Sequence, residues 1–268
     1  MLSVFSSHCC PFELIPYDRR GSESGLAGLL RMSARLREKR FTRGYLLTNS
    51  FSSALLFFLG RVKQRIGYRG QWRSALLTTA APPPPPDLHH CGRYSHLLNQ
   101  GQPTDLLPEI RVSPEEREKA RQLLEQEHCL GKLRIGLAIG AAYGPAKRWP
   151  ATHFADLAKR LAGQGCAIWL FGSPKDHAVA EEIAQLAPGL CRNLCGTTSL
   201  GQAVDLLALA DLVVCNDSGL MHVAAALNRP LTALYGSSSP GFTPPLSPLA
   251  KIVSLKLDCS PCFKRECP

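Results

Sequence analysis

The stretch "DLVVCNDSGLMHVAAALNRPLTALYG", residues 211–236, decides the fold because strand, turn, helix and strand follow one another within it. The apolar runs 211–216 and 230–236 predict buried strands, and the apolar period between them predicts a helix over 218–227. Two short apolar strands joined by a helix are typical of a parallel sheet whose faces are covered by helices. The polar turn "NDSG" therefore lies where a strand leaves the sheet and a helix begins.

The same alternation extends outward through the second half of the chain. Apolar strands alternate there with helices whose apolar residues share one face. This pattern predicts a doubly wound α/β domain from about residue 130 onward, with ligands beyond the carboxyl ends of its strands. The further strands are expected at 132–140, 166–172, 191–196 and 251–257, and the further helices at 150–165, 176–187 and 199–210.

The first half of the chain carries weaker signals. Residues 26–40 predict a helix with Leu26, Leu29, Leu30 and Leu36 on one face and basic residues on the other. The remaining expectations are a strand at 44–50, a helix or strand at 53–60, a Pro-rich loop at 81–90 and a helix at 113–127 capped by Ser113. We therefore expect two domains, 1–128 and 129–268.

Composition restricts the class of protein and its partners. The 268 residues are 45% hydrophobic and 19% charged, as in a globular protein, and carry a net charge of +10. This charge favours nucleotides, phosphorylated sugars, nucleic acid or an anionic membrane as partners. The 11 cysteines are scattered and odd in number, which favours free thiols in a reducing compartment. We see neither a membrane-spanning apolar run nor a signal peptide, and we expect a cytoplasmic protein.

The turn "NDSG" offers a site for an anion. Backbone N–H groups at the start of a helix are unpaired, and the helix dipole adds positive charge there. Ser218 and Gly219 allow a phosphate to approach closely, and His222 adds a donor. Asp217 is repelled by a phosphate, so we expect it to accept hydrogen bonds from sugar hydroxyls. The alternative is that Asp217 or Ser218 only caps the helix and His222 packs in the core.

Two further turns follow strands at the same edge of the expected sheet. "GAAYGPAKRWP", residues 140–150, contains Lys147 and Arg148, which suit phosphate as a point charge and as a bidentate donor. "FGSPKDH", residues 171–177, has small residues that admit a flat base. Taken singly, each turn is also compatible with a solvated loop. Together they predict one ligand site.

These motifs resemble a known family. "GPAKRWP" (144–150), "FGSPKDH", "CRNLCGTTSL" (191–200) and "NDSGLMHVAAALNRPLTALYGSSSPGFTPPLS" (216–247) look like the ADP-heptose:lipopolysaccharide heptosyltransferases of the heptosyltransferase II type, in glycosyltransferase family 9. The resemblance is strong over 130–268 and weaker over 26–78. It implies an α/β fold of the GT-B type, with two Rossmann-like doubly wound domains and ADP-heptose held mainly by the C-terminal one.

The resemblance also implies roles for the site residues. Lys147 would contact the diphosphate, Ser218 and Gly219 with His222 would cradle it, and Asp217 would bind hydroxyls of the donor sugar. The implied reaction is an inverting transfer of heptose to the inner core of lipopolysaccharide, with no metal and no cofactor.

The sequence departs from the family at both ends. Residues 1–25 lack the Gly-Asp turn that supplies the family's catalytic base, and Asp18 in "PYDRRGS" stands in a different context. No catalytic residue is therefore assigned. The chain also stops at "CSPCFKRECP", residues 259–268, where the family continues. We therefore expect a chain truncated at both ends, with an incomplete N-terminal domain.

Three alternatives remain open. The chain is a fragment that binds ADP-heptose without catalysis, another nucleotide-sugar enzyme of the same fold, or a basic Cys-rich module that binds metal or nucleic acid. The spacing of Cys259, Cys262 and Cys267 is compatible with thiolate ligation, but we favour free thiols and expect no nucleic-acid partner. The helix 26–40 and the basic stretch 61–73 either face a phosphorylated glycolipid at the anionic inner leaflet of the membrane or form a solvated surface.

Overall fold

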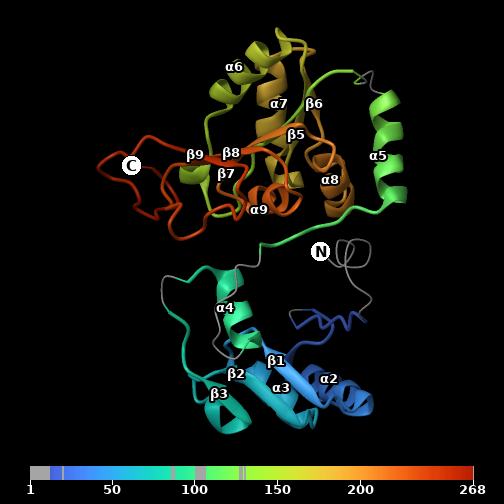
Figure 1. Cartoon of the computed structure of the whole chain (residues 1–268), viewed down its shortest axis with the longest axis vertical. Helices are drawn as coiled ribbons and strands as arrows, with labels where there is room; N and C mark the ends of the chain where they lie inside the picture. The colour runs from blue at the N-terminus through green and yellow to red at the C-terminus, as the bar shows by residue number, and fades with distance from the viewer. Residues whose placement is uncertain are drawn as a thin grey trace. The chain divides into compact units, whose positions relative to one another are not determined.

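The computed structural model describes residues 13–19, 21–85, 88–99, 107–126, 129 and 131–267. Their contacts divide the chain into a smaller unit, Glu13–Leu106, and a larger unit that contains Leu107–Pro268. Figure 1 shows the elements of each unit, which are described separately below.

The larger unit is built on a six-stranded sheet in which every pair of neighbouring strands is parallel. In their order along the chain, the strands lie 3-2-1-4-5-6 across the sheet, which is the Rossmann order. The order reverses between β4 and β7, and the ligand crevice of such a sheet opens at the carboxyl ends of these two strands. The strands are β4 (Arg134–Ala138), β5 (Ala167–Phe171), β6 (Cys191–Asn193), β7 (Leu212–Asn216), β8 (Leu231–Tyr235) and β9 (Ala250–Ser254).

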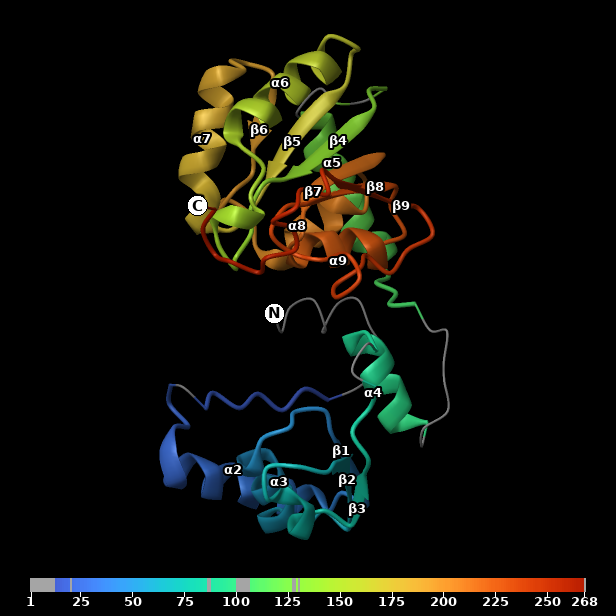
Figure 2. The same cartoon turned by 90° about the vertical axis from the view of Figure 1, so that its left-hand side faces the viewer.

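Helices cover both faces of this sheet (Figure 2). Strand β5 shows how: Ile168 and Leu170 join one buried apolar cluster, while Trp169 and Phe171 join the other, as alternation along a strand requires. The expected doubly wound α/β domain is therefore confirmed. Helices α6 (Ala151–Ala162) and α7 (His177–Leu186) contribute to the first cluster, and α5 (Pro114–Gln126), α8 (Leu200–Leu207) and α9 (Gly219–Ala226) to the second.

Reciprocal capping hydrogen bonds fix the start of two of these helices, and the sequence predicts the first of them at Ser113. The Ser113 hydroxyl accepts the N–H of Glu116 at 3.2 Å, and the Glu116 carboxylate accepts the N–H of Ser113 at 3.2 Å. Ser199 and Gln202 form the same reciprocal pair at the start of α8. Helix α5 precedes residue 129, yet its Ala120 packs in the second cluster of the larger unit.

The smaller unit has a three-stranded parallel sheet in the order β1-β2-β3. The stretch 53–60, for which the sequence allows a helix or a strand, is helical up to Leu59, and the described part of the Pro-rich loop lies between β3 and α4. The strands are β1 (Arg43–Leu46), β2 (Gln64–Tyr68) and β3 (Thr79–Ala81), and the helices are α2 (Gly25–Lys39), α3 (Phe51–Leu59) and α4 (His90–Leu98).

Helix α2 forms as expected, but its buried face differs from the prediction. Met32 and Leu36 are buried, whereas Leu26 and Leu30 are 69% and 51% exposed. The expectation that both of these leucines face the core is wrong. The buried stripe is centred on Met32 and Leu36, one turn apart, and Leu26 and Leu30 lie outside it.

A buried arginine connects the turn after β1 with the end of β2 through hydrogen bonds. Arg73 is fully buried, and its guanidinium donates to the carbonyls of Tyr68 and Thr48 and to the side-chain oxygen of Asn49. Burial lowers the pKa of Arg73. None of the helices that the structure describes has the length and apolar character needed to span a bilayer.

Candidate functional site

The candidate site lies where the strand order of the larger unit reverses. The loop with Lys147 follows β4, and the turn with Asp217 follows β7, and these two strands are paired neighbours. Parallel strands end at the same edge of a sheet, so both turns leave it side by side.

Asn216, the last residue of β7, ties the two turns together. Its side chain is fully buried, and its amide donates to the carbonyl of Ile139 at 2.7 Å. The amide oxygen accepts the N–H of Trp149 at 3.0 Å. One buried side chain thus holds both ends of the Lys147 loop against the Asp217 turn.

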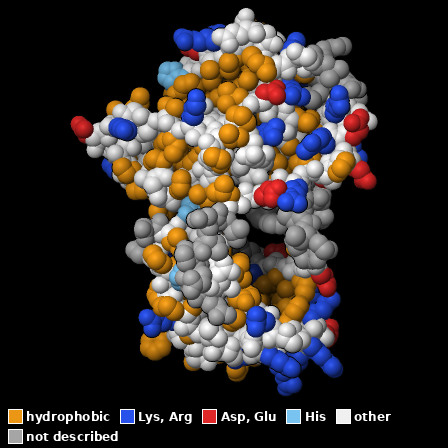
Figure 3. Space-filling view, viewed as in Figure 1, with side chains coloured by type: hydrophobic (Ala, Val, Ile, Leu, Met, Phe, Trp, Pro, Cys, Tyr) orange, Lys and Arg blue, Asp and Glu red, His pale blue; other side chains and the backbone are white. Residues whose placement is uncertain are grey.

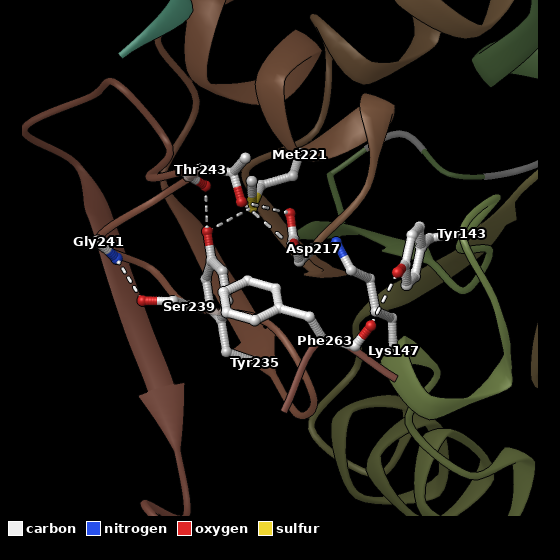
Figure 4. Close-up of polar contacts among 9 residues, drawn as sticks. All are labelled: Tyr143, Lys147, Asp217, Met221, Tyr235, Ser239, Gly241, Thr243 and Phe263. Carbon is white, nitrogen blue, oxygen red and sulfur yellow. Dashed lines mark hydrogen bonds and ion pairs between the residues drawn. The ribbon is translucent and has the colours of Figure 1, made fainter. Parts of the chain in front are cut away.

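Lys147 and Asp217 form an ion pair inside this site. The Lys147 Nζ lies 2.5 Å from the Asp217 Oδ2, and the two side chains are only 15% and 5% exposed. The Thr243 hydroxyl lies 3.3 Å from Asp217 Oδ1, and the Asp217 N–H donates to the carbonyl of Leu234 at 3.2 Å. Figure 4 shows the ammonium and the hydroxyl reaching the same carboxylate. The structure therefore brings the two predicted side chains into contact.

The start of α9 is open, as an anion site requires. Ser218 precedes the helix with an extended backbone, and its hydroxyl makes no capping hydrogen bond. The hydroxyl oxygen is buried and has no partner within the described part of the chain. A Cβ added at Gly219 would meet no atom within 4 Å. The alternative that Ser218 serves as a side-chain cap is therefore not what the structure shows.

His222 stands on the first turn of α9 within reach of both charges. Burial lowers the pKa of His222, the nearby Asp217 raises it, and Lys147 lowers it again. The net direction is down, and an ordinary histidine already titrates near 6.5. His222 is therefore neutral at pH 7, with one ring nitrogen as a donor and one as an acceptor.

Sequence reasoning missed several residues of the site that lie in the segment "YGSSSPGFT", residues 235–243. Ser237 and Ser238 are buried, and their hydroxyls have no partner among the residues that the structure describes. Buried polar atoms are nearly always hydrogen-bonded, so unsatisfied hydroxyls beside this crevice point to a bound ligand or water. The Tyr235 hydroxyl donates to the carbonyl of Thr243 at 2.6 Å, and burial raises the pKa of Tyr235.

A segment near the end of the chain, residues 260–265, straps the Lys147 loop to the turn after β8. The Tyr143 hydroxyl donates to the carbonyl of Phe263 at 2.8 Å, and the Ala146 N–H donates to the carbonyl of Arg265 at 3.0 Å. On the other side the Phe263 N–H donates to the carbonyl of Ser237 at 2.7 Å. Figure 4 shows Tyr143 and Phe263 meeting beside Lys147.

The ring of Tyr143 completes this arrangement. Lys147 Nζ lies 5.2 Å from its centroid, and the Arg265 guanidinium lies 5.4 Å from it. A ring attracts a cation over its face, so Tyr143 helps to hold the Lys147 ammonium. Gly144 is required for the close approach of the strap, because a Cβ there would lie 2.5 Å from the Arg265 carbonyl oxygen.

The third predicted turn, residues 171–177, borders the same loop. Asp176 is buried and accepts the N–H of Ser173 at 2.9 Å and its hydroxyl at 2.7 Å. The same carboxyl group lies 3.5 Å from the Arg148 guanidinium. Arg148 is thus directed at this turn, while Lys147 is directed at Asp217.

Asp18 and the three C-terminal cysteines are the remaining candidates from the sequence. Asp18 accepts the N–H groups of Gly21 and Ser22 at 2.9 and 3.2 Å, and so shapes the turn before α2. Cys259, Cys262 and Cys267 are free and line one small pocket. Within the described ranges, no three His, Cys, Asp or Glu side chains are grouped so that they could hold a metal ion.

Comparison with known proteins identifies relatives over most of the chain. Residues 29–268 match the sequence model of glycosyltransferase family 9 (heptosyltransferase). Lipopolysaccharide heptosyltransferase 2 of Escherichia coli K12 is 45% identical over 82% of this chain and 67% of its own length. Lipooligosaccharide heptosyltransferase 2 of Haemophilus influenzae is 41% identical over 84% of this chain and 68% of its own length.

A solved structure agrees with these relatives. The structure of the E. coli ADP-heptose lipopolysaccharide heptosyltransferase II superposes with a TM-score of 0.72 at 42% identity, over 84% of this chain and 72% of that one. This likeness confirms the expected GT-B type of α/β fold. The aligned region spans about two thirds of the length of the two named relatives.

Proposed function

The chain belongs to glycosyltransferase family 9, the heptosyltransferases, and from that premise we propose that it transfers a heptose from ADP-heptose to the inner core of lipopolysaccharide. The names of relatives 41–45% identical support this donor and acceptor. The observation in the chain itself that carries the proposal is the half-buried Lys147 ammonium, paired with Asp217 beside the open start of α9.

The donor binds with its diphosphate at this position. Lys147 supplies a compact positive charge, and the free N–H groups of α9 supply donors directed along the helix dipole. Ser218 and Gly219 leave room for phosphate oxygens, and neutral His222 offers a further donor. Asp217 accepts hydrogen bonds from hydroxyls of the heptose. The unsatisfied hydroxyls of the nearby turns support a polar ligand here.

The reaction is an inverting substitution at the anomeric carbon of the heptose. An acceptor hydroxyl oxygen forms a bond to this carbon while the bond to the diphosphate oxygen breaks and ADP leaves. Negative charge grows on the diphosphate as the bond breaks, so fixed donors stabilise the transition state more than the ground state. Lys147 and the start of α9 take this role. We assign no residue to the proton of the acceptor hydroxyl.

The acceptor binds to the smaller unit at one end of the basic stretch 61–73. Strand β2 runs through the middle of the basic stretch 61–73, so the two ends of the stretch lie at opposite ends of that strand. The carboxyl end carries Arg69 and Trp72, and Trp72 is 94% exposed. We assign this end to a phosphorylated glycolipid acceptor at the inner leaflet of the membrane. The free thiols support a reducing, cytoplasmic location.

A transfer assay on the chain tests this function. Purified protein is incubated with ADP-heptose and a heptose-deficient core acceptor, and the product is detected by mass spectrometry. We expect transfer from ADP-heptose and much less from UDP-sugars. Equal use of UDP-sugars would favour another nucleotide-sugar enzyme of the same fold.

The same samples distinguish catalysis from binding. Calorimetry with ADP measures whether the donor site is formed. ADP binding together with complete absence of transfer would contradict the proposed activity and support the alternative that this chain only binds the donor.

A further inference from the structure

Net charge is distributed unequally between the two units. Residues 13–106 contain 14 Lys and Arg against 6 Asp and Glu, a net charge of +8, whereas the rest of the chain contains 17 against 15, a net charge of +2. The residues assigned to the donor site all belong to the larger unit, yet most of the net positive charge belongs to the smaller one. A concentrated positive charge of this size attracts negatively charged surfaces.

Part of this charge is gathered around one hollow, formed where α2 and α3 end. The hollow has a volume of about 770 Å³ and is lined by Arg37, Arg40, Arg61 and Lys63, with Glu38 as the one acid in its lining. Two hydrogen bonds build it: Arg37 donates to the carbonyl of Leu59 at 2.9 Å, and the Lys63 N–H donates to the carbonyl of Phe41 at 3.3 Å. Figure 3 shows Lys and Arg side chains crowded around α2.

Two of these cations stand where the backbone disfavours them. Arg40 and Arg61 have φ of +50° and +53°, in the left-handed region that glycine adopts most readily. Neither forms an ion pair with the residues that the structure describes. The helix dipole stabilises a cation at the C-terminal end of a helix, but α2 already has Arg37 and Lys39 in its last turn. Arg40 is therefore not needed for this purpose. Arg40 and Arg61 thus combine a strained backbone with exposed charges of the same sign. Strain of this kind is typical of functional sites, which indicates that the two charges have a function.

Exposed apolar side chains continue from the hollow along α2. Leu26, Leu30 and Ala34 follow one another at intervals of four residues and lie on the solvent side of the helix, and Ala34 lines the hollow. Phe41 also lines it and is 39% exposed. Leucines beside a cluster of arginines are typical of helices that lie in the interface of a membrane.

We propose that this surface, formed by Leu26, Leu30, Arg37, Arg40, Phe41, Arg61 and Lys63, docks on the anionic phospholipid headgroups of a bilayer. Phosphate groups complement its four cations, and the leucines and the phenylalanine enter the boundary between headgroups and acyl chains. The inference rests on the proposed function in one respect, that a lipopolysaccharide acceptor is held in a membrane. It assigns the amino end of the stretch 61–73 to the bilayer and leaves the carboxyl end to the acceptor.

Vesicle co-sedimentation with the full chain tests this surface. We expect binding to phosphatidylglycerol–phosphatidylethanolamine vesicles, weak binding to phosphatidylcholine vesicles, and steep loss of binding as salt rises. The double variant Arg40→Gly/Arg61→Gly removes two charges and suits the left-handed backbone, so it folds without added strain. Each cation near an anionic surface is worth about a five-fold change in binding, so the double variant binds about 25-fold more weakly.

Two further variants complete the test. Lys251→Gln/Lys256→Gly is the matched control: it removes two charges from the larger unit, and Lys256 also has a positive φ, of +49°. It retains wild-type binding. Leu26→Gln/Leu30→Gln changes exposed side chains only, and it weakens binding while keeping the dependence on salt.

Equal binding by Arg40→Gly/Arg61→Gly and its control would overturn the proposal, as would absence of vesicle binding by the wild type. Loss of single-stranded RNA binding in the double variant, with no vesicle binding by the wild type, would make the surface a nucleic-acid site instead. Transfer to a lipid-free core acceptor is measured in parallel and stays unchanged in the double variant. Vesicle binding without any transfer would reject the proposed function and leave this inference standing.

Discussion

Lys147 and Asp217 carry opposite charges and therefore act in opposite directions on the binding of the proposed diphosphate. The ammonium attracts it, whereas the carboxylate repels it and competes with it for the ammonium. In the structure the two side chains satisfy each other at 2.5 Å. Donor binding therefore exchanges part of this ion pair for contacts of Lys147 with phosphate and of Asp217 with sugar hydroxyls.

Asp217→Asn separates these two roles. The amide has the same shape without the charge, so we expect ADP to bind roughly five-fold more tightly, because the repulsion of the diphosphate and the competition for the Lys147 ammonium are removed. Transfer from ADP-heptose falls about ten- to hundred-fold, because a charged acceptor for the sugar hydroxyls is lost. Calorimetry with ADP and initial rates of transfer measure the two effects. Loss of ADP binding in this variant would contradict the assignment of Asp217 to the sugar.

Gly219→Ala tests the space at the start of α9. The added methyl group meets no protein atom within 4 Å, so the thermal midpoint stays at or above that of the wild type. The same methyl group occupies the position of the phosphate, and we expect ADP affinity to fall roughly ten-fold or more. Gly163→Ala, in an exposed position after α6, is the control that keeps its affinity. Unchanged ADP binding in Gly219→Ala would place the diphosphate elsewhere.

At the scale of elements, three chain segments support the donor site beside the turn after β7 and the start of α9. The Lys147 loop, the turn after β8 and the strap of residues 260–265 are joined by backbone hydrogen bonds. The strap contacts the loop on one side and Ser237 on the other, so it fixes the position of Lys147 without reaching the start of α9 itself. Tyr143 is thus a positioning residue, whose ring contacts both Lys147 and Arg265.

Gly144→Ala tests the strap. Its Cβ would lie 2.5 Å from the Arg265 carbonyl oxygen, so either the strap or the loop must move. A forced shift of this kind costs about 1–3 kcal/mol, and we expect the thermal midpoint to fall by several degrees and ADP affinity to fall with it. Gly241→Ala, where the nearest atom is at 3.4 Å, is the control with little effect. A stable Gly144→Ala with wild-type affinity would show that the strap does not position Lys147.

The sequence predicts most of the elements of the larger unit, because apolar periods and caps are local signals. It predicts β7, α9 and the turn between them, and it places Lys147 after another strand of the same sheet. In the smaller unit, β3 lies directly before the Pro-rich loop and carries no apolar period, so the sequence does not predict it. Lys147 and Asp217 meet because β4 pairs with β7. These two strands are far apart in the sequence, so no local pattern predicts their pairing. Ser237, Ser238 and Thr243 lie in a segment without regular structure, so no pattern assigns them.

At the scale of the whole molecule, the two units have very different cores. Two large apolar clusters hold the six-stranded sheet of the larger unit, whereas the cluster of the smaller unit has Met32, Leu36 and Leu56 as its buried members. Less buried apolar surface means a smaller free energy of unfolding. The smaller unit is therefore the less stable part of the chain.

This difference predicts unfolding in two steps. Trp169 is buried in the larger unit, while Trp72 of the smaller unit is exposed already in the folded protein. In a urea titration, circular dichroism should show an early loss of helix that tryptophan fluorescence does not follow, and both signals should share the later transition. Coincident transitions in the two signals would mean that the units unfold together.

The measurement that tests the central claim most directly is calorimetry of ADP binding to the wild type and to Lys147→Ala. Removing the ammonium takes away a charge-assisted contact and leaves the buried Asp217 carboxylate beside the nucleotide, so we expect binding weaker by about 30- to 150-fold. Lys159→Ala, an exposed lysine on α6, keeps wild-type affinity. If Lys147→Ala binds ADP as tightly as the wild type, the diphosphate is not held between Lys147 and α9.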